Sequence, residues 1–167
     1  GVFATFDYWL PAFNARYGEA TGAEDFCYRA QMSNYEAVRA MFEAFAIRKP
    51  LATGVIQWMF NSALPNHLWQ LFDHYLMPTG AFYGARRACE PVNAVFDPSD
   101  RSVYLTNERL HGVRGVALEA RVLDFNSREI WHAETTLDLG PQDKARAIGI
   151  PEFEGLDRSL YFLDLRL

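Results

Sequence analysis

The sequence has 167 residues, half of them hydrophobic, with a formal net charge of −5 and an isoelectric point near 5.3. This acidic balance argues against nucleic acid and anionic membranes as partners, because both require a basic face. No apolar run has membrane-spanning length, and the two cysteines, Cys27 and Cys89, form neither a disulfide framework nor a metal-binding pattern. We therefore expect a folded chain with an apolar core and without a cofactor or a metal.

The first ninety residues predict mainly helices. Residues 5–17 predict a short helix or an irregular turn that is broken at Pro11. In residues 24–48 the apolar side chains recur at three- and four-residue steps, which is typical of a helix with one buried stripe. A shorter helix is predicted over residues 81–89.

Two carboxylates on the long predicted helix, Glu36 and Glu43, lie seven residues apart and so share a face. Such a pair would suit general acid–base chemistry, or it would belong to a solvated outer face. The sequence favours the solvated face, because acidic side chains on helices normally point to water.

Residues 53–62 predict a strand that is buried on both faces, because the run is too apolar for a half-solvated strand. Such strands are typical of a parallel sheet under helices, where ligands bind outside the carboxyl ends of the strands. The apolar residues of this run are Val55, Ile56, Met59 and Phe60.

Trp58, Asn61 and Ser62 lie at the carboxyl end of this predicted strand. Together they suit a sugar, since an aromatic face can cover the C–H side of the ring while polar groups bind its hydroxyls. The alternative is a core tryptophan whose N–H is hydrogen-bonded, and the residues taken alone favour that alternative.

After Pro91 the apolar period changes to two, which indicates antiparallel strands separated by turns. The composition changes at the same place, since residues 1–90 hold 18 of the 25 aromatic residues. We therefore predict one domain over residues 1–90 and an all-β sandwich over residues 91–167. The six candidate strands span residues 92–96, 102–106, 116–123, 130–139, 145–150 and 160–167.

Both predicted domains lack parts. Six strands are one fewer than an immunoglobulin-like sandwich normally has, so we expect residues 91–167 to lack the last strand. One buried strand with a few helices leaves its backbone edges unpaired, and a closed parallel barrel takes roughly 250 residues. We infer that residues 1–90 are the C-terminal part of a TIM (β/α)8 barrel. The chain is then a piece of a larger protein and folds only with the rest of the barrel.

Four segments, in order, resemble glycoside hydrolase family 2, in the branch of β-mannosidases, exo-β-D-glucosaminidases and mannosylglycoprotein endo-β-mannosidases. Residues 53–65 resemble the eighth barrel strand of that branch, with its Gly-x-x-x-Trp-x-x-Asn core at Gly54, Trp58 and Asn61. Residues 33–45 resemble the preceding helix, residues 81–91 the last barrel helix, and residues 103–107 the second strand of the following sandwich.

The resemblance implies a retaining β-glycosidase that hydrolyses terminal β-mannosidic or β-glucosaminidic linkages in a β-linked oligosaccharide. Such enzymes use two carboxyl groups about 5 Å apart, and in this family both glutamates follow strands before the eighth. Residues 1–52 predict no buried strand that ends in Glu, so we expect neither catalytic carboxylate in this chain and no activity of the chain alone. The resemblance also implies that Trp58 forms part of the wall around the sugar, with Asn61 and Ser62 at its rim.

Two positions depart from the family pattern. Ser62 stands where the family often has Asp, and Leu64 stands where an aromatic residue usually precedes the proline. Both lie near the implied substrate entrance, so they leave the preferred sugar open. The resemblance favours a secreted or periplasmic protein, and it makes the remainder of the barrel a partner, in the same protein or as a nicked chain. A non-catalytic carbohydrate-binding or structural module remains the alternative function.

Overall fold

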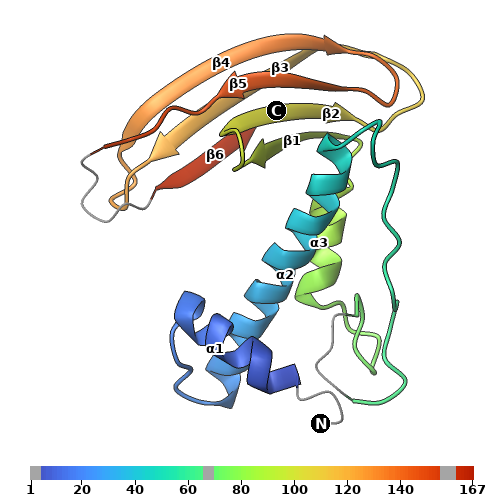
Figure 1. Cartoon of the computed structure of the whole chain (residues 1–167), viewed down its shortest axis with the longest axis vertical. Helices are drawn as coiled ribbons and strands as arrows, with labels where there is room; N and C mark the ends of the chain where they lie inside the picture. Colours follow the sequence, from blue (N-terminus) through green and yellow to red (C-terminus); the bar gives the residue numbers. More distant parts are fainter. Residues whose placement is uncertain (1–4, 66–69, 155–160) are drawn as a thin grey trace. The chain divides into compact units, whose positions relative to one another are not determined.

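The computed structural model describes residues 5–65, 70–154 and 161–167, and side chains from residue 7 onward (Figure 1). The chain divides into two compact units. The first combines Gly1–Phe42 with Val55–Ala88, and the second combines Glu43–Gly54 with Cys89–Leu167. None of the described helices is long and apolar enough to cross a membrane.

The first unit is helical. It contains α1 (Thr5–Tyr17), most of α2 (Ala23–Ile47) and α3 (Gly80–Ala88), close to the predicted positions. The predicted break at Pro11 is wrong, because α1 continues through this proline. A proline inside a helix loses one hydrogen bond. Aromatic rings pack beside it: the Phe13 ring lies 4.5 Å from that of Trp9 and 5.6 Å from that of Phe26.

Two glycines allow α3 to approach α2 very closely. A Cβ atom on Gly80 would lie 2.0 Å from the carbonyl oxygen of Gln31, and one on Gly84 would lie 2.4 Å from that of Tyr35. The Gly80 backbone N–H also donates to the Gln31 side chain at 2.6 Å. The small core beside this contact consists of Val38, Ala81 and Ala85, with Phe42 and Leu71 packed against it.

Residues 53–62 do not form the predicted buried strand. Among the described residues their only sheet pairing is one isolated parallel bridge, between Asn61 and Phe72, and Figure 1 draws the segment as an irregular trace. Ile56 is 93% exposed and Phe60 is also exposed, while Val55 is half-buried. A strand buried on both faces needs a neighbour at each edge and helices on each side, and the described chain supplies one bridge. The barrel itself is therefore not shown by this chain.

In the described residues of the second unit, six strands form an antiparallel β-sandwich at nearly the predicted positions. One sheet has the order β1-β2-β5 and the other β4-β3-β6 (Figure 1). The bounds are β1 (Val92–Asp97), β2 (Ser102–Asn107), β3 (Val113–Leu123), β4 (Glu129–Leu139), β5 (Lys144–Gly149) and β6 (Phe162–Arg166). This arrangement fits the predicted immunoglobulin-like sandwich. The predicted last strand included residue 160, which lies outside the described residues.

The core of the sandwich is fully buried. Its inward side chains come from both sheets and include Val103, Leu105, Leu118, Ala120 and Val122, each at most 1% exposed. Along β3 these positions alternate with partly buried ones, so the period of two in the sequence corresponds to the two faces of this sheet. In β2 the neighbouring Ser102 and Thr106 are buried as well. Within the described chain β6 pairs with β3 alone. A further strand that completes the sandwich stays a prediction.

The second unit also includes Glu43–Gly54, a segment that precedes the sandwich by about 40 residues. The Lys49 ammonium group forms an ion pair with Glu108, and the Lys144 ammonium group donates a hydrogen bond to the carbonyl oxygen of Ile47. Arg48 lies 3.8 Å from the carboxylate of Asp97. The second unit is therefore formed by two separate parts of the sequence, which these contacts hold together.

Candidate functional site

The predicted substrate-binding residues lie on an exposed apolar segment, residues 55–64, which we call the Trp58 arm. Trp58 itself is 74% exposed, and Ile56, Phe60 and Leu64 are also exposed. The Gln57 side-chain amide donates to the Trp58 carbonyl oxygen at 3.2 Å. In this chain the indole is accessible to a ligand.

The end of the Trp58 arm is fixed by backbone pairing. The Phe72 N–H donates to the Phe60 carbonyl oxygen at 3.0 Å, next to the parallel bridge between Asn61 and Phe72. The Phe72 ring lies 4.8 Å from that of Phe60 and 5.0 Å from that of Phe82 on α3. Asn61 is exposed beside this anchor, so its amide has access to solvent.

Ser62 differs from the other two predicted substrate-binding residues. It is 3% exposed, its hydroxyl donates to the carbonyl oxygen of Leu64, and the Leu64 N–H lies 3.4 Å from the same hydroxyl oxygen. Serine hydroxyls often hold turns in this way. The structure therefore brings Trp58 and Asn61 onto one exposed arm and turns Ser62 inward, where it holds the turn that follows.

The two helical carboxylates lie in different surroundings. Glu36 accepts hydrogen bonds from the Arg16 guanidinium at 2.7 Å and from the Tyr17 hydroxyl. Burial, and then the Glu36 carboxylate, raises the pKa of Tyr17 above its ordinary value. Glu43 is only 9% exposed, so the predicted solvated outer face is wrong for this residue. Ile47, one turn further on, is also buried, which indicates that this end of α2 buries a second stripe.

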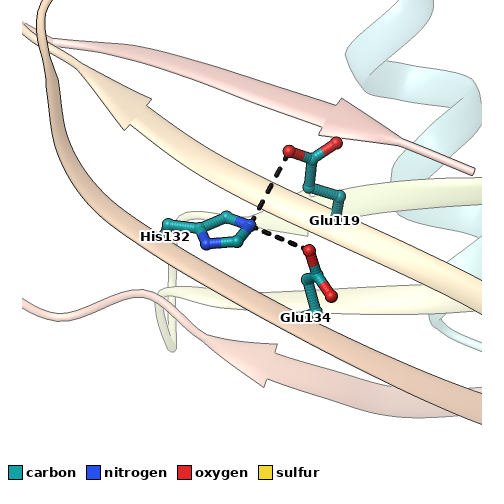
Figure 2. Close-up of side chains that lie close together, drawn as sticks. All are labelled: Glu119, His132 and Glu134. Carbon is teal, nitrogen blue, oxygen red and sulfur yellow. Dashed lines mark ion pairs between the residues drawn. The ribbon is translucent and has the colours of Figure 1, made fainter.

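One polar cluster was missed by the sequence analysis. Glu119 on β3 and His132 and Glu134 on β4 place three potential metal-ligating atoms within 4.8 Å of one another (Figure 2). The residues belong to two strands, so no local spacing connects them. The available signal was His132 and Glu134 at alternate positions of a predicted strand, which places both on one face.

A comparison with family models gives no match for this chain. Curated relatives do match. An exo-beta-D-glucosaminidase from Streptomyces avermitilis is 45% identical over 131 residues, which is 75% of this chain and 14% of the relative. An exo-beta-D-glucosaminidase from Amycolatopsis orientalis is 35% identical over 151 residues, 87% of this chain and 15% of the relative. A mannosylglycoprotein endo-beta-mannosidase from Lilium longiflorum is 32% identical over 111 residues, 66% of this chain and 12% of the relative.

Solved structures give the same result. A variant of the exo-chitosanase CsxA from Amycolatopsis orientalis, in complex with PNP-beta-D-glucosamine, matches 93% of this chain with a TM-score of 0.85 and 34% identity, over 19% of its own length. A beta-D-mannosidase from Dictyoglomus thermophilum matches 92% of this chain and 19% of its own with a TM-score of 0.80, but at 17% identity this match shows the fold alone.

The chain thus spans less than a fifth of the length of these relatives and structures. The match to the CsxA structure includes both units, since it covers 93% of the chain. The resemblance that the ordered motifs predict is confirmed: this chain is similar to a segment of the β-mannosidase and exo-β-D-glucosaminidase branch of glycoside hydrolase family 2.

Proposed function

We propose that this chain is part of a retaining β-glycosidase that hydrolyses terminal β-glucosaminidic or β-mannosidic linkages. In this proposal residues 1–90 are the C-terminal segment of its TIM-barrel catalytic domain, and residues 91–167 belong to the immunoglobulin-like domain that follows. The observation that supports it most is the 45% identity to an exo-beta-D-glucosaminidase over 75% of the chain. The catalytic glutamates lie outside this chain, so the chain alone is inactive.

The exposed Trp58 arm supports the proposal physically. Apolar side chains exposed in one continuous segment normally mark a surface that another part of a protein covers. Ile56 and Phe60 lie on either side of Trp58 and are exposed as well, so neighbouring barrel strands would bury them while the indole faces the bound sugar. Asn61 supplies polar groups for the sugar hydroxyls. The predicted rim role of Ser62 is the weakest part, since its hydroxyl is engaged with Leu64.

The decisive experiment uses the natural protein that contains this chain. We expect it to hydrolyse an aryl β-D-glucosaminide or an aryl β-mannoside, and we expect Trp58→Ala to lower kcat/KM by about tenfold or more, because the aromatic contact with the sugar is lost. Tyr28→Ala is the matched control, since Tyr28 is an exposed aromatic residue on α2. A folded protein without turnover of either substrate would contradict the proposal.

The alternative, a non-catalytic carbohydrate-binding module, is favoured by one observation: the Trp58 indole is already accessible in this chain. Titration of the 167-residue chain with chitosan or mannan oligosaccharides distinguishes the two. Saturable binding that Trp58→Ala abolishes, in a protein without glycosidase activity, would support the alternative.

A further inference from the structure

The cluster of Glu119, His132 and Glu134 is built on two paired strands. The register places Glu119 on β3 directly opposite Glu134 on β4, and His132 lies two residues before Glu134, so all three side chains share one face of the sheet. The His132 Nε2 atom lies 3.7 Å from the Glu119 carboxylate and 3.3 Å from that of Glu134 (Figure 2). In Figure 2 both carboxylates point toward the same imidazole nitrogen.

These separations are close to those of a metal site. Zinc binds histidine nitrogen and carboxylate oxygen at about 2.0–2.2 Å in tetrahedral geometry, which separates neighbouring ligand atoms by about 3.4 Å. The two observed distances from the imidazole are near this value, and all three ligand atoms lie within 4.8 Å of one another. Glu134 is the most exposed of the three, with its side chain 70% exposed, so it can rotate to close the remaining gap.

The neighbouring cation, Arg121, divides its guanidinium group between Glu119 and Asp164. Arg121 lies opposite His132 in the register, and its Nε atom is 3.5 Å from Glu119, yet this Nε makes no hydrogen bond within the described chain. The other end of its guanidinium group donates to Asp164 on β6, and this hydrogen bond raises the pKa of Arg121. Arg121 is therefore hydrogen-bonded to Asp164 and ion-paired with Glu119, so a metal ion would bind Glu119 beside this guanidinium group.

We propose that Glu119, His132 and Glu134 bind one Zn2+ ion on the face of the β4-β3-β6 sheet. One imidazole and two carboxylates are a donor set for a borderline cation, whereas Ca2+ and Mg2+ prefer oxygen ligands alone. Three protein ligands leave the fourth position to water. The ion joins β3 to β4 by side chains, and it offsets two negative charges that face each other across the strands.

The test is calorimetric titration of the intact protein, stripped with EDTA, with ZnCl2. We expect saturable 1:1 binding in the micromolar range, weakened about tenfold or more by His132→Gln, Glu119→Gln or Glu134→Gln. His111→Gln is the matched control, because His111 is also an exposed histidine of the second unit but lies outside the cluster, and it keeps wild-type affinity. Since Zn2+ binds the native state, it should also raise the Tm of the wild-type protein and not that of His132→Gln.

Three results would overturn the proposal. The first is that the protein shows no saturable Zn2+ binding at Zn2+ concentrations up to about 1 mM. The second is His132→Gln binding Zn2+ as tightly as the wild type while the metal-free circular dichroism spectra agree. The third is Ca2+ binding as tightly as Zn2+, which would reveal a nonspecific acidic surface. If His132→Gln does not fold, the isosteric Glu119→Gln variant decides by the same criteria.

Discussion

The sandwich and the Trp58 arm contain similar apolar sequences but bury them very differently. In the sandwich Leu105 is fully buried, and its partners come from both sheets of the same unit. On the arm Ile56 is 93% exposed, and one parallel bridge at Asn61 is the only sheet pairing among the described residues of 53–62. A hydrophobic run thus predicts that a segment will be buried, but it does not identify the segments that bury it. The sandwich supplies its own, and we propose that the rest of a barrel supplies those of the arm.

The sharpest test of this contrast pairs one core and one arm substitution. Leu105→Ala should lower the free energy of unfolding by about 2–5 kcal/mol, because it leaves a cavity among fully packed side chains. Ile56→Ala should change it by less than about 0.5 kcal/mol in the 167-residue chain, because its side chain is exposed there. Urea unfolding of both variants measures the difference. In the complete barrel, Ile56→Ala should lower the free energy of unfolding by nearly as much as a core substitution. If its effect is equally small in the 167-residue chain and in the complete protein, Ile56 is not buried by neighbouring barrel strands.

A second test addresses how the sandwich closes its loops. Asn107 is fully buried, and its side-chain amide donates to the carbonyl oxygens of His111 at 2.9 Å and Gly140 at 2.7 Å, while the Arg109 N–H donates back to it at 3.0 Å. Asn107→Ala should lower the free energy of unfolding by about 2–4 kcal/mol, because three buried hydrogen bonds are lost. Asn126→Ala, in an exposed turn, is the control. Thermal unfolding measures both, and equal Tm values would contradict this role of Asn107.

In the helical unit we expect the largest loss of stability from a substitution that separates α3 from α2. Gly84→Ala adds a Cβ that would lie 2.4 Å from the Tyr35 carbonyl oxygen, so α3 has to move away from α2. We expect a loss of about 1–3 kcal/mol, as for overpacked cores. Gly54→Ala is the matched control, since its Cβ meets nothing within 4 Å. Chemical denaturation followed by helical circular dichroism measures the effect, and a Gly84→Ala variant as stable as Gly54→Ala would show that the helices are not in close contact.

The smallest expected effect is electrostatic and depends on pH. Hydrogen bonds from Arg29 and from the Thr21 N–H lower the pKa of Asp25 to about 2. The folded state therefore binds this proton less readily than the unfolded state, and the resulting stability is present at neutral pH and lost as the pH falls through about 2. Asp25→Asn should lower the Tm slightly at pH 7, and the difference should vanish between about pH 4 and pH 2. Glu24→Gln, in the same helical turn, is the control. A difference that persists at pH 2 would contradict this assignment.

Most local structure could be predicted, because it depends on periodicity and turns within a few residues. The strands of the sandwich and α2 followed from the apolar period, whereas the predicted strand at residues 53–62 did not form. The apolar period gave no information on which segments pack against one another. α1 continues through Pro11 beside the packed rings of Phe13 and Phe26, and Glu43 is buried although it is an acidic residue on a helix. Both are tertiary effects that override local preference.

The candidate site was predictable in part. Trp58 and Asn61 were singled out by a family motif, since their chemistry alone favoured a core tryptophan. The inward hydroxyl of Ser62 has a local cause, its bond to the Leu64 carbonyl oxygen two residues later, and such serine turns are visible in sequence. The cluster around His132 was not predictable, because it depends on the register between β3 and β4, and a shift by one residue would separate its members.

The ion pair between Lys49 and Glu108 has a consequence for how this chain can be divided or exchanged. The second unit is discontinuous in sequence, because Glu43–Gly54 belongs to it while Val55–Ala88 does not. A recombination event at the start of β1 would transfer the strands without Lys49 and without Ile47, whose carbonyl oxygen accepts the hydrogen bond of Lys144. The transplanted sandwich would carry a Glu108 carboxylate that has lost its counter-ion. The helical segment and the sandwich are therefore expected to be inherited together, because separating them breaks both contacts.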